Sequence, residues 1–160
     1  ADLDLVASLL SDGKESRLYK RIVKEKEIAK SIRASQGSGL HGSRFIISAT
    51  AAPGHTTDEV VAEVNAVIAE LTGDAPPTAD EIDAGRVNFE RSFYDRITTI
   101  QGKGELLQSY NMYHGEPDYI GTDLARYQGV TPETAARWAG EVFAAPHVEL
   151  HIVPATEEGQ

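Results

Sequence analysis

The 160-residue sequence contains no cysteine and no run of 18 apolar residues. The lack of cysteine excludes disulfide bonds and thiolate chemistry, and it leaves the redox compartment undetermined. The lack of a long apolar run excludes a transmembrane helix. No signal peptide is present, and the chain opens ADLDLVASLL without an initiator methionine, as a mature or excised piece of a longer protein would.

Two sequence motifs of common enzyme classes are missing as well. No G-x-S-x-G segment occurs, so the sequence offers no nucleophile elbow of the hydrolase type. The glycine-containing stretches 37–39 and 102–104 are too short for a phosphate-binding loop, which needs the full Walker spacing.

The segment HVELH at 147–151 places two histidines four residues apart, as zinc-binding helices do. Prolines 146 and 154 bracket it, and its apolar residues alternate with polar ones, which favours a strand. We expect Val148, Leu150 and Ile152 to point into the core and the histidines to point outward. The pattern therefore predicts a closing strand over 147–153 and no metal site.

The net charge of −10 is spread unevenly along the chain. Residues 14–33 hold eight Lys or Arg against three Glu, which gives 8 − 3 = +5 and leaves −15 for the rest. A basic helix can bind nucleic acid, but this one has a single aromatic residue, Tyr19, and the acidic body would repel phosphate. We interpret residues 14–33 as a solvated face, with neither nucleic acid nor a membrane as a partner.

The hydrophobic periodicity predicts a single α+β domain over residues 1–160. A helix covers roughly 3–10, and two strands over 28–36 and 43–52 form a hairpin that the strand 147–153 joins. Thr56 with Glu59, and Thr78 with Glu81, form capping boxes that open two long helices. Further helices are expected over 106–113, 118–127 and from Thr131–Pro132, and Gly102–Lys103–Gly104 should end or kink the helix before it. The result is an antiparallel sheet covered by several helices.

The segment LLSDGKESRLYKRIVKEKEIAKSIRA resembles the hallmark segment of pitrilysin/insulinase-type domains, which also occur in mitochondrial processing peptidases. There a leucine-rich helix ends in a glycine turn, and Ser-Arg-Leu-aromatic opens a helix that runs into a strand. The matching positions here are Leu9, Leu10, Gly13, Ser16, Arg17, Leu18 and Tyr19. The later helices and the closing strand follow in the same order.

The resemblance implies two similar halves around a chamber. One half holds zinc through an H-x-x-E-H motif and a distant glutamate, and the other helps to hold the extended peptide substrate. None of the five histidines here fits that motif, so this chain resembles the non-catalytic half, with no cofactor of its own and with zinc in the partner. The parent would be a zinc metalloendopeptidase, and this chain would be inactive alone. The strand that usually precedes the first helix is missing, which suggests a truncated portion.

Candidate substrate-binding residues follow from the resemblance and from one aromatic cluster. Partner domains of this kind often carry an Arg and a Tyr seven residues apart, but Val23 and Lys30 occupy those positions here, so Lys30 could rebuild the contact. Arg17 and Tyr19 are further candidates, with ion pairing and core packing as the alternative roles. The polar-aromatic cluster could line a peptide channel or simply cover a helix end; its members are Tyr110, Tyr113, His114 and Tyr119, near Glu116 and Pro117.

Three functions remain open at this stage. The first is a non-catalytic domain that pairs with a catalytic half in the same chain or in a separate subunit. The second is a purely structural or assembly subunit on the same fold, and the third is an unrelated protein-binding module. The substrate and the compartment are undetermined, with a bacterial periplasm or cytoplasm as the expectation.

Overall fold

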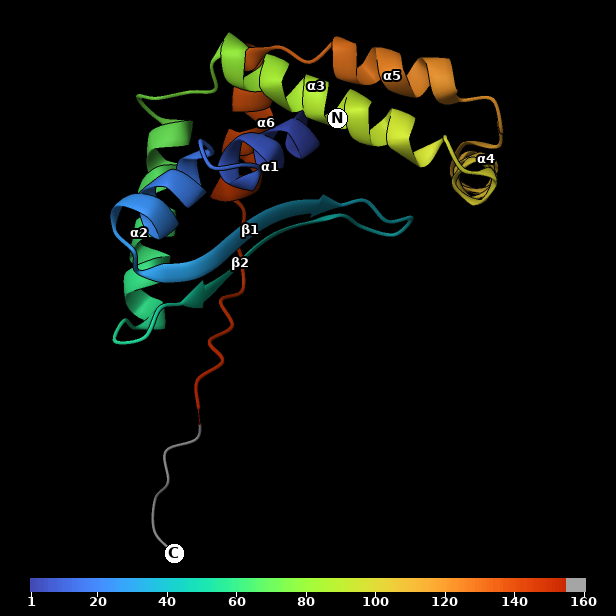
Figure 1. Cartoon of the computed structure of the whole chain (residues 1–160). Coiled ribbons are helices and arrows are strands. Elements are labelled where there is room, and N and C mark those ends of the chain that lie inside the picture. The colour runs from blue at the N-terminus through green and yellow to red at the C-terminus, as the bar shows by residue number, and fades with distance from the viewer. Residues whose placement is uncertain (155–160) are drawn as a thin grey trace, which may run out of the picture.

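The computed structural model describes residues 1–154 and consists of a two-stranded antiparallel sheet with helices on one side of it (Figure 1). Strands β1 (Ala29–Gly37) and β2 (Arg44–Ala51) form the hairpin expected for 28–36 and 43–52. The helices are α1 (Asp2–Ser11), the π-helix η1 (Tyr19–Glu25), α2 (Thr57–Thr72), α3 (Ala79–Arg96), α4 (Ile100–His114), α5 (Ile120–Gln128) and α6 (Pro132–Ala144). The predicted α+β class is confirmed. Within the described residues, none of these helices is long and apolar enough to cross a membrane.

Helix α1 is the centre of the main core. Six consecutive residues from Leu5 to Leu10 are buried, because α1 packs against β1, α3 and α6 at once. The strands bury Ile32 and Ala34 against it, and α2 adds Leu71 from its own apolar stripe. Burying each of these large side chains contributes roughly 1.5–3 kcal/mol.

Three helix starts carry the caps that the sequence predicts. Thr56 and Thr78 each accept a hydrogen bond from the backbone N–H three residues on, and Glu59 and Glu81 return a bond to the cap backbone. Thr131 caps α6 in the same way, with Pro132 in the first turn. These capping side chains accept hydrogen bonds from backbone N–H groups that have no partner within the first turn of a helix.

Helices α3 and α4 meet at a sharp corner whose position differs from the prediction. Helix α3 ends at Arg96, and the glycines expected to break it lie inside α4. Thr99 is the N-cap of α4, since its side chain accepts the N–H of Gly102. A Cβ on Gly102 would lie 1.9 Å from the carbonyl oxygen of Arg96. Gly102 therefore permits the close approach of the two helices and does not end either of them.

The closing strand predicted over 147–153 is wrong in this structure. Residues 145–154 follow α6 outside any helix or strand, and Val148, Leu150 and Ile152 are 93%, 81% and 83% exposed. A strand needs a backbone partner along its length, and the sheet of the described residues contains only β1 and β2, which pair with each other. The C-terminal segment instead runs past β2 and away from the body (Figure 1). A bond of 2.8 Å between Thr57 Oγ1 and His151 Nδ1 ties it to the start of α2.

Candidate functional site

Arg17 lies where η1, the end of α2 and the start of α3 meet. Its guanidinium donates to the Glu81 carboxylate twice, from Nε at 2.6 Å and from Nη2 at 2.7 Å. It also donates to the carbonyl oxygens of Ala75 at 2.5 Å and Pro76 at 3.0 Å. Arg17 therefore closes the connection between α2 and α3, which is the pairing role considered as its alternative.

The Glu81 carboxylate is stabilised as an anion. Burial favours its neutral form, yet hydrogen bonds from Arg17 and from the backbone N–H of Thr78 outweigh burial and hold the pKa of Glu81 below its ordinary value. Glu81 is thus both the cap partner of α3 and the anchor of Arg17, so one carboxylate joins the start of α3 to the segment before η1.

A second arginine, which lies on η1, is paired in the same manner. Arg21 donates to both oxygens of Glu70 on α2, at 2.7 and 2.9 Å. This bond from Arg21 lowers the pKa of Glu70. Arg17 and Arg21 line a shallow cavity of about 350 Å³ together with Lys20 and Glu25. The two arginines are neutralised by their partners, whereas Lys20 forms no ion pair within the described residues 1–154.

Tyr19 is the first residue of η1, and Lys30 lies on the following strand β1. Tyr19 is partly buried and packs against the main core. Lys30 is exposed on β1, at a register irregularity between Ala29 and Ser31. No ion pair of Lys30 is found among residues 1–154, so within that range Lys30 presents an unpaired cation on the sheet, while Tyr19 mainly fills space.

Tyr110 and Tyr113 belong to a separate region on α4. Tyr110 is buried in a small second core with Phe93 and Leu106, and its hydroxyl donates to Asp123 Oδ2 at 2.8 Å. Burial and this bond raise the pKa of Tyr110, so the phenol stays a proton donor. Tyr113 is 52% exposed.

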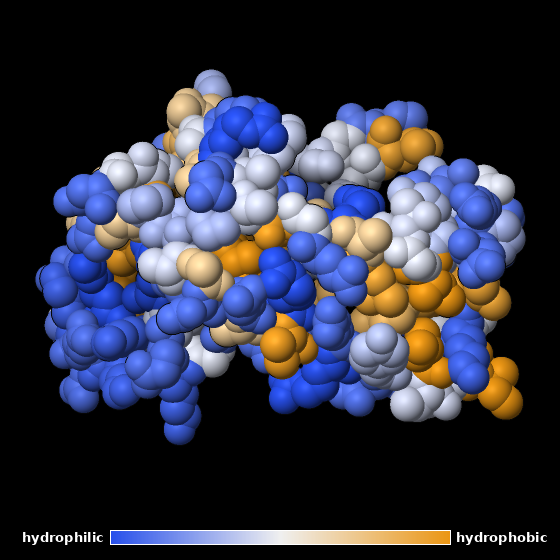
Figure 2. Space-filling model, turned by 90° about the horizontal axis from the view of Figure 1, so that it is seen from above, coloured by the Kyte–Doolittle hydropathy of each residue, from blue (hydrophilic) through white to orange (hydrophobic). Residues whose placement is uncertain are grey.

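Helix α4 lies at the end of the molecule opposite α2 (Figure 1). Apolar side chains gather at this end of the surface (Figure 2). The exposed ones on α4 include Ile100, Leu107 and Met112. The structure thus separates the predicted site residues into two groups, one of Arg17, Tyr19 and Lys30 and one of Tyr110 and Tyr113.

The hairpin presents a free backbone edge on β2. Ser11 Oγ accepts the N–H of Ala34 at 2.8 Å, so this N–H points away from β2. Ala34 pairs with Ile47, and partners in such a pair turn their N–H groups to opposite edges of the ribbon. The N–H groups of Ile47 and, two residues on, Ala49 therefore face the outer edge of β2. Of the described strands, none pairs with that edge.

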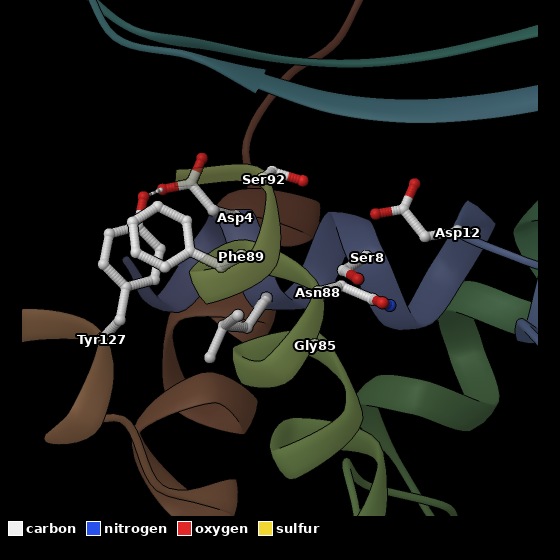
Figure 3. A pocket seen from close by; sticks show the side chains of 9 residues that line it. Asp4, Ser8, Asp12, Gly85, Asn88, Phe89, Ser92 and Tyr127 are labelled. Atoms are coloured by element: carbon white, nitrogen blue, oxygen red, sulfur yellow. Dashed lines mark hydrogen bonds between the residues drawn. The ribbon is translucent and has the colours of Figure 1, made fainter. Parts of the chain in front are cut away.

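A pocket between α1 and α3 was not predicted from the sequence (Figure 3). It has a volume of about 210 Å³, and its lining residues are Asp4, Leu5, Ser8, Asp12, Gly85, Asn88, Phe89, Ser92 and Tyr127. The four-residue spacing of Asp4, Ser8 and Asp12 is visible in the sequence. The opposing wall on α3 could not be assigned without the packing of the two helices.

Metal ligands are the remaining requirement for peptidase chemistry. Residues 1–154 contain no group of three or more His, Cys, Asp or Glu side chains arranged to hold a metal ion. His147 and His151 contact Glu149 at 3.3 and 3.6 Å, but all three lie on the exposed C-terminal segment. The donors placed by residues 1–154 do not fit the zinc site of a peptidase, which needs three protein ligands and an open position.

Comparison with known proteins identifies the class of this fold. The family described as the peptidase M16 inactive domain matches residues 1–88. A candidate zinc protease from Bordetella pertussis superposes with a TM-score of 0.76 at 20% identity, over 88% of this chain and 76% of that one. The inactive peptidase domain of a candidate zinc protease from Bordetella parapertussis gives a TM-score of 0.76 at 20% identity, over 88% of this chain and 75% of that one.

A longer protease shares the fold as well. A protease from Helicobacter pylori superposes with a TM-score of 0.77 at 20% identity, over 89% of this chain but 34% of its own length. A comparison with curated proteins gives no match. The family match covers more than half of the chain, and the chain belongs to the inactive-domain family of the M16 metallopeptidases.

Proposed function

We propose that this chain is the non-catalytic wall of a peptidase chamber and pairs with a half that carries zinc. The observation that carries the proposal is the match of residues 1–88 to the inactive-domain family. Two solved structures of the same fold are named as candidate zinc proteases. Zinc would be held by the H-x-x-E-H motif of the partner half, on the same polypeptide or on another.

The contribution of this chain is to hold the substrate. Peptide hydrolysis at neutral pH needs an activated water and a stabilised oxyanion, and both would come from the zinc-bearing half. Holding the scissile bond in a fixed geometry lowers the barrier without a chemical step on this chain.

The outer edge of β2 is the surface that we propose for peptide binding. An extended peptide can join such an edge as an added strand, and its backbone bonds give affinity that tolerates many sequences. The N–H groups of Ile47 and Ala49 would donate to the carbonyl oxygens of the peptide. Lys30, Arg33 and Arg44 are exposed on the hairpin and would favour acidic peptide segments.

The remaining predicted site residues fit this proposal to different degrees. Tyr113 is exposed and could contact a peptide that extends toward α4. Arg17, Tyr19 and Tyr110 are held by contacts within the chain, so we propose that they support the binding surface indirectly.

The test is binding of a fluorescent unfolded peptide to the 160-residue chain with and without Ala49→Pro. Proline removes the outward N–H of Ala49 but no hydrogen bond between β1 and β2. Loss of binding with an unchanged circular dichroism spectrum is expected, and Ala49→Ser serves as the control. Equal binding by the proline variant would contradict the use of this edge.

A further inference from the structure

The pocket between α1 and α3 is lined by regularly spaced polar groups. Asp4 and Ser8 are four residues apart on one face of α1, and Asp12 follows at the same spacing directly after the helix ends at Ser11. Asn88 and Ser92 repeat that spacing on α3. The pocket is therefore a groove between two packed helices, with polar groups on both walls (Figure 3).

Ser8 is a largely buried residue whose hydroxyl has no partner within the described part of the chain. It is only 9% exposed, it lines the pocket, and its Oγ takes part in none of the hydrogen bonds found among residues 1–154. Gly85 keeps the hydroxyl uncovered, since a Cβ at that position would lie 3.5 Å from Ser8 Oγ. The Oγ atom itself stays accessible from the pocket, since Asp2 Oδ1 is the buried side-chain atom left without a partner among residues 1–154, so the Ser8 hydroxyl is available to a ligand.

The charge of the pocket is negative. Asp4 already accepts from the Tyr127 hydroxyl at 2.9 Å and pairs with the Ala1 ammonium at 3.2 Å. The carboxylate of Asp12 has no such cation within 4.0 Å among residues 1–154. No Lys, Arg or His lines the pocket, so Asp12 supplies an uncompensated negative charge beside Ser8.

Apolar atoms cover the other end of the pocket. Leu5 and Phe89 line it, and Phe89 stacks on Tyr127 with ring centroids 3.4 Å apart. An aliphatic stem can pack on such a surface while its charged head reaches the acceptors. Among cationic side chains, arginine fits several separated acceptors best, because its planar group presents five N–H donors.

We propose that this pocket binds the guanidinium group of an arginine side chain presented by the partner half. Asp12 would accept a charge-assisted bond, and Ser8, Asn88 and Ser92 would accept the remaining N–H groups. Only the identity of the neighbour, the zinc-bearing half, rests on the proposed function. The chemistry of the pocket stands on the geometry of α1 and α3.

The test titrates the 160-residue chain with N-acetyl-arginine methylamide and follows the amide signals of Ser8, Asn88 and Ser92 by NMR. We expect saturable shifts, with binding at least about tenfold weaker for the neutral citrulline analogue. Asp12→Asn should weaken binding by about tenfold, since Asp12 is exposed and its replacement leaves the core intact. Asp74→Asn removes the same charge in the turn before α3, away from the pocket lining, and should change affinity less than twofold.

Equal binding of the arginine and citrulline probes, or of the parent chain and Asp12→Asn, would overturn the inference. Absence of shifts at Ser8 and Asn88 would do the same, whether or not the two halves associate. Binding of the arginine probe by a chain that fails to pair with the zinc-bearing half would leave the pocket assignment intact and refute the proposed function.

Discussion

Arg17 and Glu81, 64 residues apart in the chain, are joined by two hydrogen bonds of 2.6 and 2.7 Å. The pair links the segment before η1 to the first turn of α3, and the Arg17 side chain is only 18% exposed. Since Glu81 also caps α3, the contact fixes the orientation of a long helix against the body.

Replacing Arg17 with Met should lower the free energy of unfolding by about 1–2 kcal/mol. This is the contribution expected of a charge-assisted hydrogen bond after a reduction for solvent screening. Lys24→Met removes a cation from the exposed Lys24–Glu15 pair and should cost less than about 0.5 kcal/mol. Urea unfolding at pH 7 measures both. Equal effects of the two substitutions would contradict a structural role for Arg17.

The Arg17 effect should depend on pH, because the folded-state pKa of Glu81 is lowered. A carboxyl with a lowered folded pKa contributes stability above its unfolded pKa of about 4.3, and the contribution is lost as pH falls through the folded value. The difference between the parent chain and Arg17→Met should therefore be constant near pH 7 and shrink below about pH 4.5. A pH-independent difference would show that Glu81 does not titrate with this pair.

Gly102 and Gly104 offer a matched comparison within α4. Gly102→Ala would place a Cβ 1.9 Å from the Arg96 oxygen, whereas at Gly104 nothing lies within 4 Å. We expect Gly102→Ala to destabilise by about 1–3 kcal/mol through strain, and Gly104→Ala to stabilise by about 0.5–1 kcal/mol through helix propensity. The midpoint temperature of thermal unfolding of each variant provides the measurement. Stabilisation by both substitutions would contradict the close contact between Gly102 and Arg96.

Leu150 should contribute little to the stability of this chain, because it is 81% exposed. Leu150→Ala is expected to change the free energy of unfolding by less than about 0.5 kcal/mol. Leu10→Ala, at a side chain that is 0% exposed, should cost about 2–5 kcal/mol. A large loss at Leu150 would mean that the C-terminal segment packs as the sequence pattern predicts.

The purified chain should hold no stoichiometric zinc. The motivation is the sequence, which lacks H-x-x-E-H, and a donor set in residues 1–154 that does not fit a metal. Elemental analysis after dialysis without chelator provides the measurement. One zinc per chain that disappears in His147→Ala or His151→Ala would assign a metal to the HVELH segment.

Local signals in the sequence were sufficient for much of the fold. The capping threonines 56, 78 and 131 and the hairpin strands were predicted close to their observed positions, because caps and strand alternation act within a few residues. The predicted position of the break between α3 and α4 is wrong. The prediction rests on the low helix propensity of glycine, whereas in the structure Gly102 lies inside α4 and its lack of a side chain allows the close approach of Arg96.

Contacts between distant segments limited the rest of the prediction. The alternation in 147–153 indicates a strand, but whether a strand forms depends on a partner that the pattern does not contain. The roles of Arg17 and the pocket beside Ser8 depend on Glu81 and Gly85, which only the packing of α3 brings into contact. The sequence therefore indicates which residues are candidates for the site, but the contacts among them are defined only by the three-dimensional structure.

The most direct test of the central claim is hydrolysis of an unfolded peptide by three samples: this chain alone, the H-x-x-E-H-bearing half alone, and the two together. The account predicts chelator-sensitive cleavage only when both are present. Cleavage by this chain alone that a chelator abolishes, or full activity of the zinc-bearing half without this chain, would contradict it.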